Sequence, residues 1–263
     1  MHAVILAGSM VMKMKMLNEL SDIFSNDQPK ICVPLTPMDE TDLKRQLEKI
    51  HQQSADIDLI EWRADYWQGD LEEGLEMVSK HLQNFHKPLL FTIRTAEEGG
   101  EKDVPSAEYE RLIRMSGKYS CFMMYDLQLA LVKQSGGALR VLMDDLHKAK
   151  KRIILSYHDF HATPSDEQML AILKEEESLG ADLVKLAVMP QTETDCDRLM
   201  QVSKTFTQIH KTPAITISMG ELGVKSRIQV RESGSCITFA SASASSAPGQ
   251  LPASRLRKLL QTQ

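Results

Sequence analysis

Lys185 stands inside the nearly unbroken apolar run ADLVKLAVMP, residues 181–190. A lysine is rarely buried without a reason, because removing an ammonium ion from water is costly. Burial favours the neutral amine, which attacks ketones and aldehydes to give a Schiff base. The resulting iminium makes the neighbouring C–H bond acidic. A site built on Lys185 therefore also needs a base.

His158 is the histidine that falls at the end of a strand-like run, RIILSYH, and histidine ionises near neutral pH. Arg63, Arg94, Arg227 and Glu61 could recognise an anion and hydroxyl groups. Each residue taken singly also has an ordinary structural explanation: a solvent-facing strand lysine, a core histidine, or an ion pair within EWRAD. Because all of these residues are expected at one site, a catalytic role is favoured over separate structural roles.

The elements that must position these residues recur about every 30 residues, the length of one strand plus a crossover helix. Amphipathic stretches such as SDEQMLAILKEEESLG separate short apolar runs. The pattern predicts an α/β fold, a single (β/α)8 TIM barrel over residues 29–263. The eight runs are KICVPL (30–35), IDLIEWR (57–63), PLLFTIR (88–94), CFMMYDLQL (121–129), RIILSYH (152–158), ADLVKLAV (181–188), PAITISM (213–219) and SCITFA (235–240).

Active sites of such barrels lie at the C-terminal ends of the strands, and most of these runs end in polar groups. Strand alternation places Leu183, Lys185 and Ala187 on the inner face of their strand. The other run ends carry Glu61, Arg63, Asp65, Arg94, Asp126, Gln128, His158, Asp159 and Met219.

Composition narrows the class of protein. The net charge of −5 gives no general reason to expect nucleic-acid binding. Four cysteines stand far apart without a C-x-x-C pair, which argues against a zinc site or a disulfide framework and suits the cytoplasm. Residues 1–28 are expected to form an irregular N-terminal extension. Neither they nor any later run resembles a signal peptide or a membrane span.

Six motifs in order resemble the type I 3-dehydroquinate dehydratase family, from about residue 29 to the end of the chain. They are EWRAD, FTIRTAEEGGE, SYHDF, KLAVMPQ, SMGELGVKSR and SSAPGQ. The resemblance implies a lyase of the shikimate pathway, which makes chorismate for aromatic amino acids. It would convert 3-dehydroquinate to 3-dehydroshikimate by syn elimination of water through a lysine Schiff base. It also implies no metal or cofactor, a cytoplasmic location and a homodimer.

The resemblance further implies roles for individual residues. Lys185 would form the imine with the C3 ketone, and His158 would remove the C2 proton and later protonate the departing C1 hydroxyl. Glu98 would orient His158. Arg227 would hold the substrate carboxylate. The ring hydroxyls would meet Glu61, Arg63 and Arg94, a lid would supply Ser246 and Gln250, and apolar walls would come from Met219 and Phe239.

Two other functions stay open on the residues alone. A class I aldolase also uses a barrel lysine imine, but the SAPGQ and RTAEEGG segments disfavour it. A non-catalytic relative could bind a shikimate-like acid. Gln128 keeps that alternative open, since the family usually has a glutamate there. Asp126 and Gln128 share a strand face and are expected at the floor of the pocket.

Overall fold

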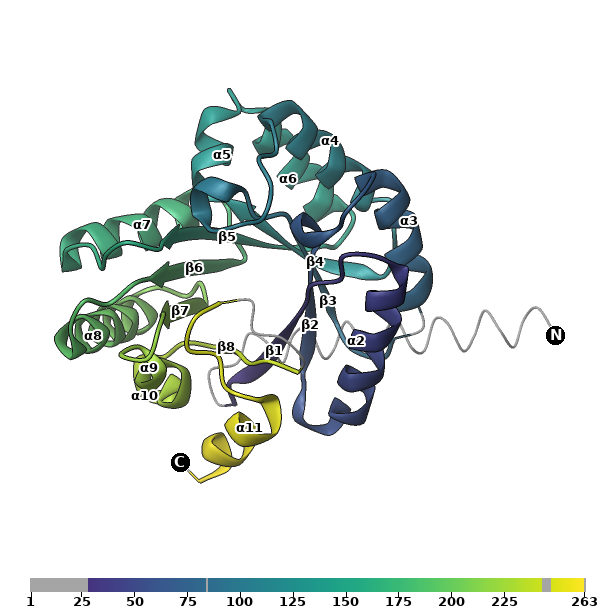
Figure 1. The fold of residues 1–263 in the computed structure, drawn as a ribbon. Helices are drawn as coiled ribbons and strands as arrows, with labels where there is room; N and C mark the ends of the chain where they lie inside the picture. Colours follow the sequence, from purple (N-terminus) through teal and green to yellow (C-terminus); the bar gives the residue numbers. More distant parts are fainter. Residues whose placement is uncertain (1–27, 84, 243–246, 263) are drawn as a thin grey trace.

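The computed structural model describes residues 28–83, 85–242 and 247–262, and its eight strands form one nearly closed parallel sheet (Figure 1). The strand order is β7-β6-β5-β4-β3-β2-β1-β8. An isolated parallel bridge between Ala214 and Ser235 lies where β7 approaches the chain leading into β8. The predicted (β/α)8 barrel is confirmed. The strands are β1 (Lys30–Leu35), β2 (Leu59–Arg63), β3 (Leu89–Thr92), β4 (Phe122–Gln128), β5 (Arg152–Asp159), β6 (Leu183–Val188), β7 (Ala214–Ser218) and β8 (Ile237–Phe239).

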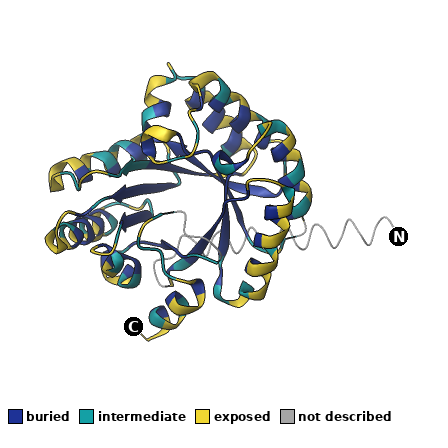
Figure 2. Cartoon of the chain, in the orientation of Figure 1, coloured by how far each residue is buried: buried dark blue, intermediate teal, exposed yellow. Residues whose placement is uncertain are grey.

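Helices surround the strands and turn their buried faces towards them (Figure 2). Local sequence explains where several begin; a capping box of Ser165 and Gln168, for example, starts α7. The helices are α2 (Glu40–Gln52), α3 (Leu71–Leu82), α4 (Ser106–Ser116), α5 (Leu129–Gln134), α6 (Ala138–Lys148), α7 (Asp166–Ser178), α8 (Glu193–Ile209), α9 (Val224–Ile228), α10 (Val230–Ser233) and α11 (Ala253–Gln261).

Strand β6 has two different faces, as its alternation predicts. Leu183 and Ala187 belong to the apolar cluster inside the barrel. Val184, Leu186 and Val188 belong to the cluster between the sheet and the helices α7 and α8. Lys185 alternates in phase with Leu183 and Ala187 and so lies on the same face of the strand. Its side chain therefore enters the barrel.

The register between β5 and β6 fixes the relative height of two chemical groups. Ser156 pairs with Lys185, and His158 pairs with Ala187. His158 therefore lies one inward position nearer the C-terminal mouth than Lys185, on the adjacent strand. Ala187 leaves space beside it.

Some predicted strand ends are corrected by the structure. The run PLLFTIR was expected to be strand to Arg94, but β3 ends at Thr92. The backbone N–H of Arg94 instead donates to Asp65 Oδ1 at 3.2 Å, which takes it out of the sheet ladder. The last strand was expected over 235–240 and spans only Ile237–Phe239.

Nearly all of the predicted N-terminal extension, residues 1–27, lies outside the described residues. Within the described ranges, no helix has the length and apolarity needed to cross a membrane. The same residues contain no group of three or more histidines, cysteines and carboxylates placed to hold a metal ion.

Candidate active site

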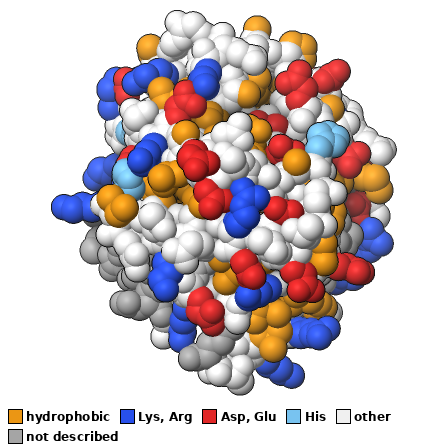
Figure 3. Space-filling model, turned by 90° about the vertical axis from the view of Figure 1, so that its left-hand side faces the viewer, with side chains coloured by type: hydrophobic (Ala, Val, Ile, Leu, Met, Phe, Trp, Pro, Cys, Tyr) orange, Lys and Arg blue, Asp and Glu red, His pale blue; other side chains and the backbone are white. Residues whose placement is uncertain are grey.

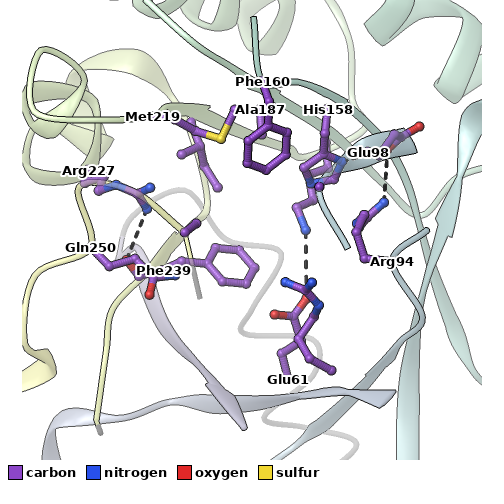
Figure 4. A pocket seen from close by; sticks show the side chains of 15 residues that line it. Glu61, Arg94, Glu98, His158, Phe160, Ala187, Met219, Arg227, Phe239 and Gln250 are labelled. Atoms are coloured by element: carbon purple, nitrogen blue, oxygen red, sulfur yellow. Dashed lines mark hydrogen bonds and ion pairs between the residues drawn. The ribbon is translucent and has the colours of Figure 1, made fainter. Parts of the chain in front are cut away.

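A pocket opens inside the C-terminal ends of the strands (Figure 4). It brings together all ten of the predicted site residues that the structure describes. The eleventh, Ser246, lies outside the described residues. Sequence reasoning did not assign Gly99, Phe160, Ile217 or Ala247 to the site. The lining residues are Glu61, Arg63, Arg94, Glu98, Gly99, His158, Phe160, Lys185, Ala187, Ile217, Met219, Arg227, Phe239, Ala247 and Gln250.

Lys185 reaches into this pocket with its side chain 5% exposed. Its Nζ lies 2.7 Å from Asp126 Oδ2 and 4.0 Å from Glu61 Oε1. It also lies 4.8 Å from the centre of the Phe239 ring. Among the described residues, the charged groups in direct contact with this amine are these two carboxylates. The apolar ring on the other side limits access of water.

Asp126 lies behind Lys185 and is shared with Arg94. The Arg94 guanidinium is 2.7 Å from Asp126 Oδ1, and the Ser156 hydroxyl donates to the same oxygen at 2.6 Å. Burial raises the pKa of Asp126, but the Arg94 and Lys185 cations outweigh burial and hold that pKa well below its ordinary range. Asp126 is therefore a fixed anion that holds the two cations. Asp126 and Gln128 were both expected at the floor of the pocket, but neither of them is among the residues that line it.

His158 and Glu98, which line the same pocket as Lys185, form a hydrogen-bonded pair. His158 Nδ1 is 2.9 Å from Glu98 Oε2, and that oxygen also accepts from Arg94 at 3.1 Å. A carboxylate can only accept, so Nδ1 carries the proton and Nε2 has the free lone pair. Burial and the Arg94 charge lower the pKa of His158 to about 4, despite the opposing effect of Glu98. At neutral pH His158 is thus an uncharged base.

Arg227, on α9, lies across the pocket from His158 and Glu98 (Figure 4). It is 2% exposed, and its guanidinium donates to the backbone carbonyls of Phe239 at 3.3 Å and Pro248 at 3.0 Å. Its Nε has no hydrogen-bond partner, and no ion pair to Arg227 occurs among the described residues. Burial lowers the pKa of Arg227 to about 10, still well above neutral pH. A buried cation with spare donor capacity is suited to an anionic ligand.

On the face drawn in Figure 3, acidic and basic side chains are interspersed. Among its described residues, this face therefore has no broad positive patch that could attract an anion in place of Arg227. With a net charge of −5, an anion entering the pocket would depend on individual buried cations such as Arg227.

Arg63 and Glu61, from β2, are held in place by neighbours. Arg63 forms a bidentate ion pair with Asp65, in which Nε lies 2.8 Å from Oδ1 and a terminal guanidinium nitrogen lies 2.7 Å from Oδ2. The Arg63 guanidinium carbon lies 5.0 Å from the centre of the Tyr66 ring. The ion pair considered for EWRAD therefore exists, although Arg63 also lines the pocket. Glu61 accepts a hydrogen bond from the Thr92 hydroxyl at 3.0 Å.

Apolar side chains form the rest of the wall. Met219, at the end of β7, and Phe239, in β8, are both buried. Phe160, labelled in Figure 4, lines the pocket and packs against the apolar cluster that contains Met219 and Phe239. Gln250 lines the pocket next to Arg227 and has contacts of its own within the chain. The site thus combines a buried amine, a neutral imidazole and a buried cation in a partly apolar chamber.

This arrangement has known counterparts. A family model for type I 3-dehydroquinase matches residues 31–263. The chain belongs to the type I 3-dehydroquinase family. Among curated relatives of this 3-dehydroquinase, the 3-dehydroquinate dehydratase of Bacillus licheniformis is 36% identical over 239 residues, which cover 89% of this chain and 91% of the relative. That of Listeria welshimeri is 35% identical over 242 residues, covering 90% and 93%.

Solved structures agree with the assignment to the 3-dehydroquinases. The crystal structure of 3-dehydroquinate dehydratase from Geobacillus kaustophilus matches with a TM-score of 0.83 and 33% identity, covering 90% of this chain and 91% of that one. The type I enzyme from Clostridium difficile, with covalently modified comenic acid, matches with a TM-score of 0.81 and 32% identity, covering 89% and 92%.

Proposed function

We propose that this type I 3-dehydroquinase dehydrates 3-dehydroquinate to 3-dehydroshikimate through an imine on Lys185. The observation that carries the proposal is the β5–β6 register, which sets the neutral base His158 beside and just above the buried amine. A ketone captured by Lys185 would then present its neighbouring C–H bond to the imidazole.

Lys185 is the nucleophile. The Lys185 ammonium passes one proton to the C3 carbonyl oxygen as its nitrogen adds to C3; that oxygen takes a second proton from the nitrogen and leaves as water, so that the protonated imine (iminium) remains. Asp126, fixed by Arg94, holds the Lys185 ammonium in the resting site and so orients it towards the chamber.

His158 moves the protons of the elimination. Nε2 takes the C2 proton, and the electron pair of that bond forms an enamine with the iminium. Collapse of the enamine expels the C1 hydroxyl, which receives the same proton from His158 and leaves as water. Hydrolysis of the product imine returns Lys185 and releases 3-dehydroshikimate. The Glu98 carboxylate supports the imidazolium while the proton is on His158.

The remaining residues bind the substrate. Arg227 holds the carboxylate, and Glu61, Arg63 and Arg94 bind ring hydroxyls. Gln250 and Ser246 bind the ligand, while Met219 and Phe239 exclude water. No residue in this scheme requires a cofactor.

The paired base and amine favour this reaction over the alternatives considered from the sequence. A protein that only binds a shikimate-like acid has no need of a neutral histidine held by a buried carboxylate. An aldolase would break a C–C bond, whereas the family match supports dehydration. A homodimer in the cytoplasm stays a prediction.

The test combines activity with capture of the intermediate. The parent protein should convert 3-dehydroquinate to a product with the ultraviolet absorbance of a conjugated enone. Borohydride added with substrate should leave a ligand-sized mass on the peptide containing Lys185, and borohydride alone should leave activity intact. Lys185→Met should lose both signals. A label on any other lysine would contradict the assignment.

A further inference from the structure

Gln128, the last residue of β4, bonds through both ends of its side-chain amide to a single residue, Thr95. Its Oε1 accepts the Thr95 N–H at 2.8 Å, and its Nε2 donates to the Thr95 hydroxyl at 2.9 Å. Gln128 is 1% exposed and is not among the residues that line the pocket. Its own backbone N–H donates to the Tyr109 hydroxyl of α4 at 3.3 Å. A buried amide satisfied in this way fixes its partner.

Thr95 begins the tight turn that carries Glu98. The Thr95 carbonyl accepts from the N–H groups of Glu98 at 3.0 Å and Gly100 at 2.9 Å. At Gly99 the φ angle is +79°, and a Cβ there would come within 2.3 Å of the Phe160 ring. The turn is therefore confined between Thr95 and Phe160, and a shift of Thr95 would carry Glu98 with it.

Glu98 is in turn the hydrogen-bond partner of His158. Burial raises the pKa of Glu98, but contacts with His158 and Arg94 bring it below its ordinary value. Gln128 thus holds the start of the turn through Thr95, and His158 and Arg94 contact the carboxylate near its end.

We propose that Gln128 is a positioning residue for proton transfer, because its amide holds Thr95, and through it the Glu98 carboxylate, in line with His158. The inference rests on the proposed roles of Glu98 and His158. Gln128 contacts neither Lys185 nor the residues assigned to the substrate carboxylate. Losing it should therefore slow the proton steps without preventing formation of the imine.

A graded set of variants tests this inference in the full-length protein. Gln128→Met keeps the length of the side chain but removes both hydrogen bonds. It should lower kcat about tenfold, since small misplacement of a catalytic group is costly, with KM within about twofold. Gln128→Glu keeps an oxygen for the Thr95 N–H and should recover most of the loss. Thr95→Val removes only the hydroxyl partner and should lie between Gln128→Met and the parent.

Two further measurements separate positioning from general destabilisation. Borohydride trapping at saturating substrate should be complete in every variant. In nitrogen-15 spectra of labelled histidine, the Nδ1–H signal of His158 should be sharp in the parent and in Gln128→Glu, and broadened by exchange in Gln128→Met.

Gln46 provides a matched control. Its buried amide makes the same type of contact away from the pocket, accepting the Thr36 N–H at 2.9 Å and donating to Asp42 at 2.8 Å. Gln46→Met should lower the melting temperature much as Gln128→Met does, while leaving kcat at the parent value.

The inference is overturned if Gln128→Met keeps the parent kcat, if Gln46→Met loses as much, or if Gln128→Glu does no better than Gln128→Met. His158→Ala, measured in the same assays, distinguishes a failure of the role proposed for Gln128 from a failure of the proposed function. If His158→Ala turns over normally, the mechanism itself is wrong; if it stalls while Gln128→Met does not, only the role of Gln128 fails.

Discussion

Asp126 Oδ2 lies 2.7 Å from Lys185 Nζ, while the other oxygen of the same carboxylate binds Arg94 at 2.7 Å. One fully buried anion thus bridges two buried cations, which also lie 3.1 Å from Glu98 (Arg94) and 4.0 Å from Glu61 (Lys185). Asp126→Asn would remove the closest counter-ion of both cations inside the barrel. We expect the free energy of unfolding to fall by about 3–5 kcal/mol, as when one partner of a buried pair is removed.

The measurement for Asp126→Asn is urea unfolding compared with an exposed pair. Asp197 contacts Lys225 at 2.6 Å with both side chains about half exposed. Asp197→Asn should change stability by less than about 1 kcal/mol. Equal losses in the two variants would mean that Asp126 does not act as the shared counter-ion.

Removing the base should separate capture of the substrate from its elimination. His158→Ala should still form the imine on Lys185, so that an adduct accumulates and is visible by intact mass. Turnover should fall by about 10²–10⁴. Glu98→Gln should lose less, because the amide still offers an oxygen to Nδ1–H and only the charge is gone. A loss in Glu98→Gln equal to that in His158→Ala would contradict this order.

The pH dependence of kcat/KM should report the low pKa of His158. Burial and Arg94 depress this pKa to about 4, so the base is neutral above that value and becomes protonated as pH falls through it. Activity should stay on its plateau from neutral pH to about pH 5 and decline near pH 4. A decline near the ordinary histidine value of about 6.5 would show that His158 is not shielded in this way.

Arg227→Lys tests recognition of the carboxylate. Lysine cannot reproduce the planar fork of the guanidinium, and a charge-assisted hydrogen bond contributes about 1.5–3 kcal/mol. Calorimetric affinity for the product should fall by roughly one to two orders of magnitude. Borohydride trapping at saturating substrate should persist. If the variant binds product as tightly as the parent, Arg63 or Arg94 becomes the better candidate for the carboxylate contact.

Glu176, on α7, should make stability depend on pH. It is fully buried; Oε2 accepts the Lys185 backbone N–H at 2.9 Å, and Oε1 has no partner among the described residues. Burial raises its pKa well above the ordinary value of 4.5. At low pH the Glu176 carboxyl is protonated and burying it costs little. Its contribution to the free energy of unfolding is lost as pH rises from above 4.5 through the raised pKa.

Melting temperatures measured across pH check this effect. Glu176→Gln should match the parent near pH 5 and become progressively more stable than the parent at alkaline pH. Glu177, whose pKa is lowered by hydrogen bonds to Thr212 and His210 that outweigh its burial, is the control of opposite sign. Glu177→Gln should instead lose stability relative to the parent as pH rises towards 4.5, and the difference should stay constant above that pH. Parallel curves for the parent and Glu176→Gln would refute the prediction.

The sequence predicted the barrel and the strand-borne part of the site because both depend on periodicity. Alternation along β6 determines which way Lys185 points, and the 30-residue spacing brings His158 to the same end of the barrel. The motifs located Arg227 and Glu98, which lie outside the strands. Their roles stay predictions, as does that of Ser246.

Contacts between side chains from different elements could not be predicted in this way. The pairing of Lys185 with Asp126 depends on how far two side chains reach across the barrel, and periodicity contains no such information. The double hydrogen bond of Gln128 to Thr95 depends likewise on the path of the turn after β3. Phe160 follows the SYHDF histidine by two residues and could have been placed near the pocket from that spacing.

The base and the amine stand on hydrogen-bonded neighbouring strands, whereas Arg227 and Gln250 stand on segments that follow β7 and β8. Mutation can therefore alter the two halves of the site separately during evolution. Replacements after β7 and β8 could change which β-hydroxy ketone is accepted while the strand pair keeps its chemistry. Descendants with new substrate ranges should differ mainly in those two segments and keep Lys185, Ala187 and His158.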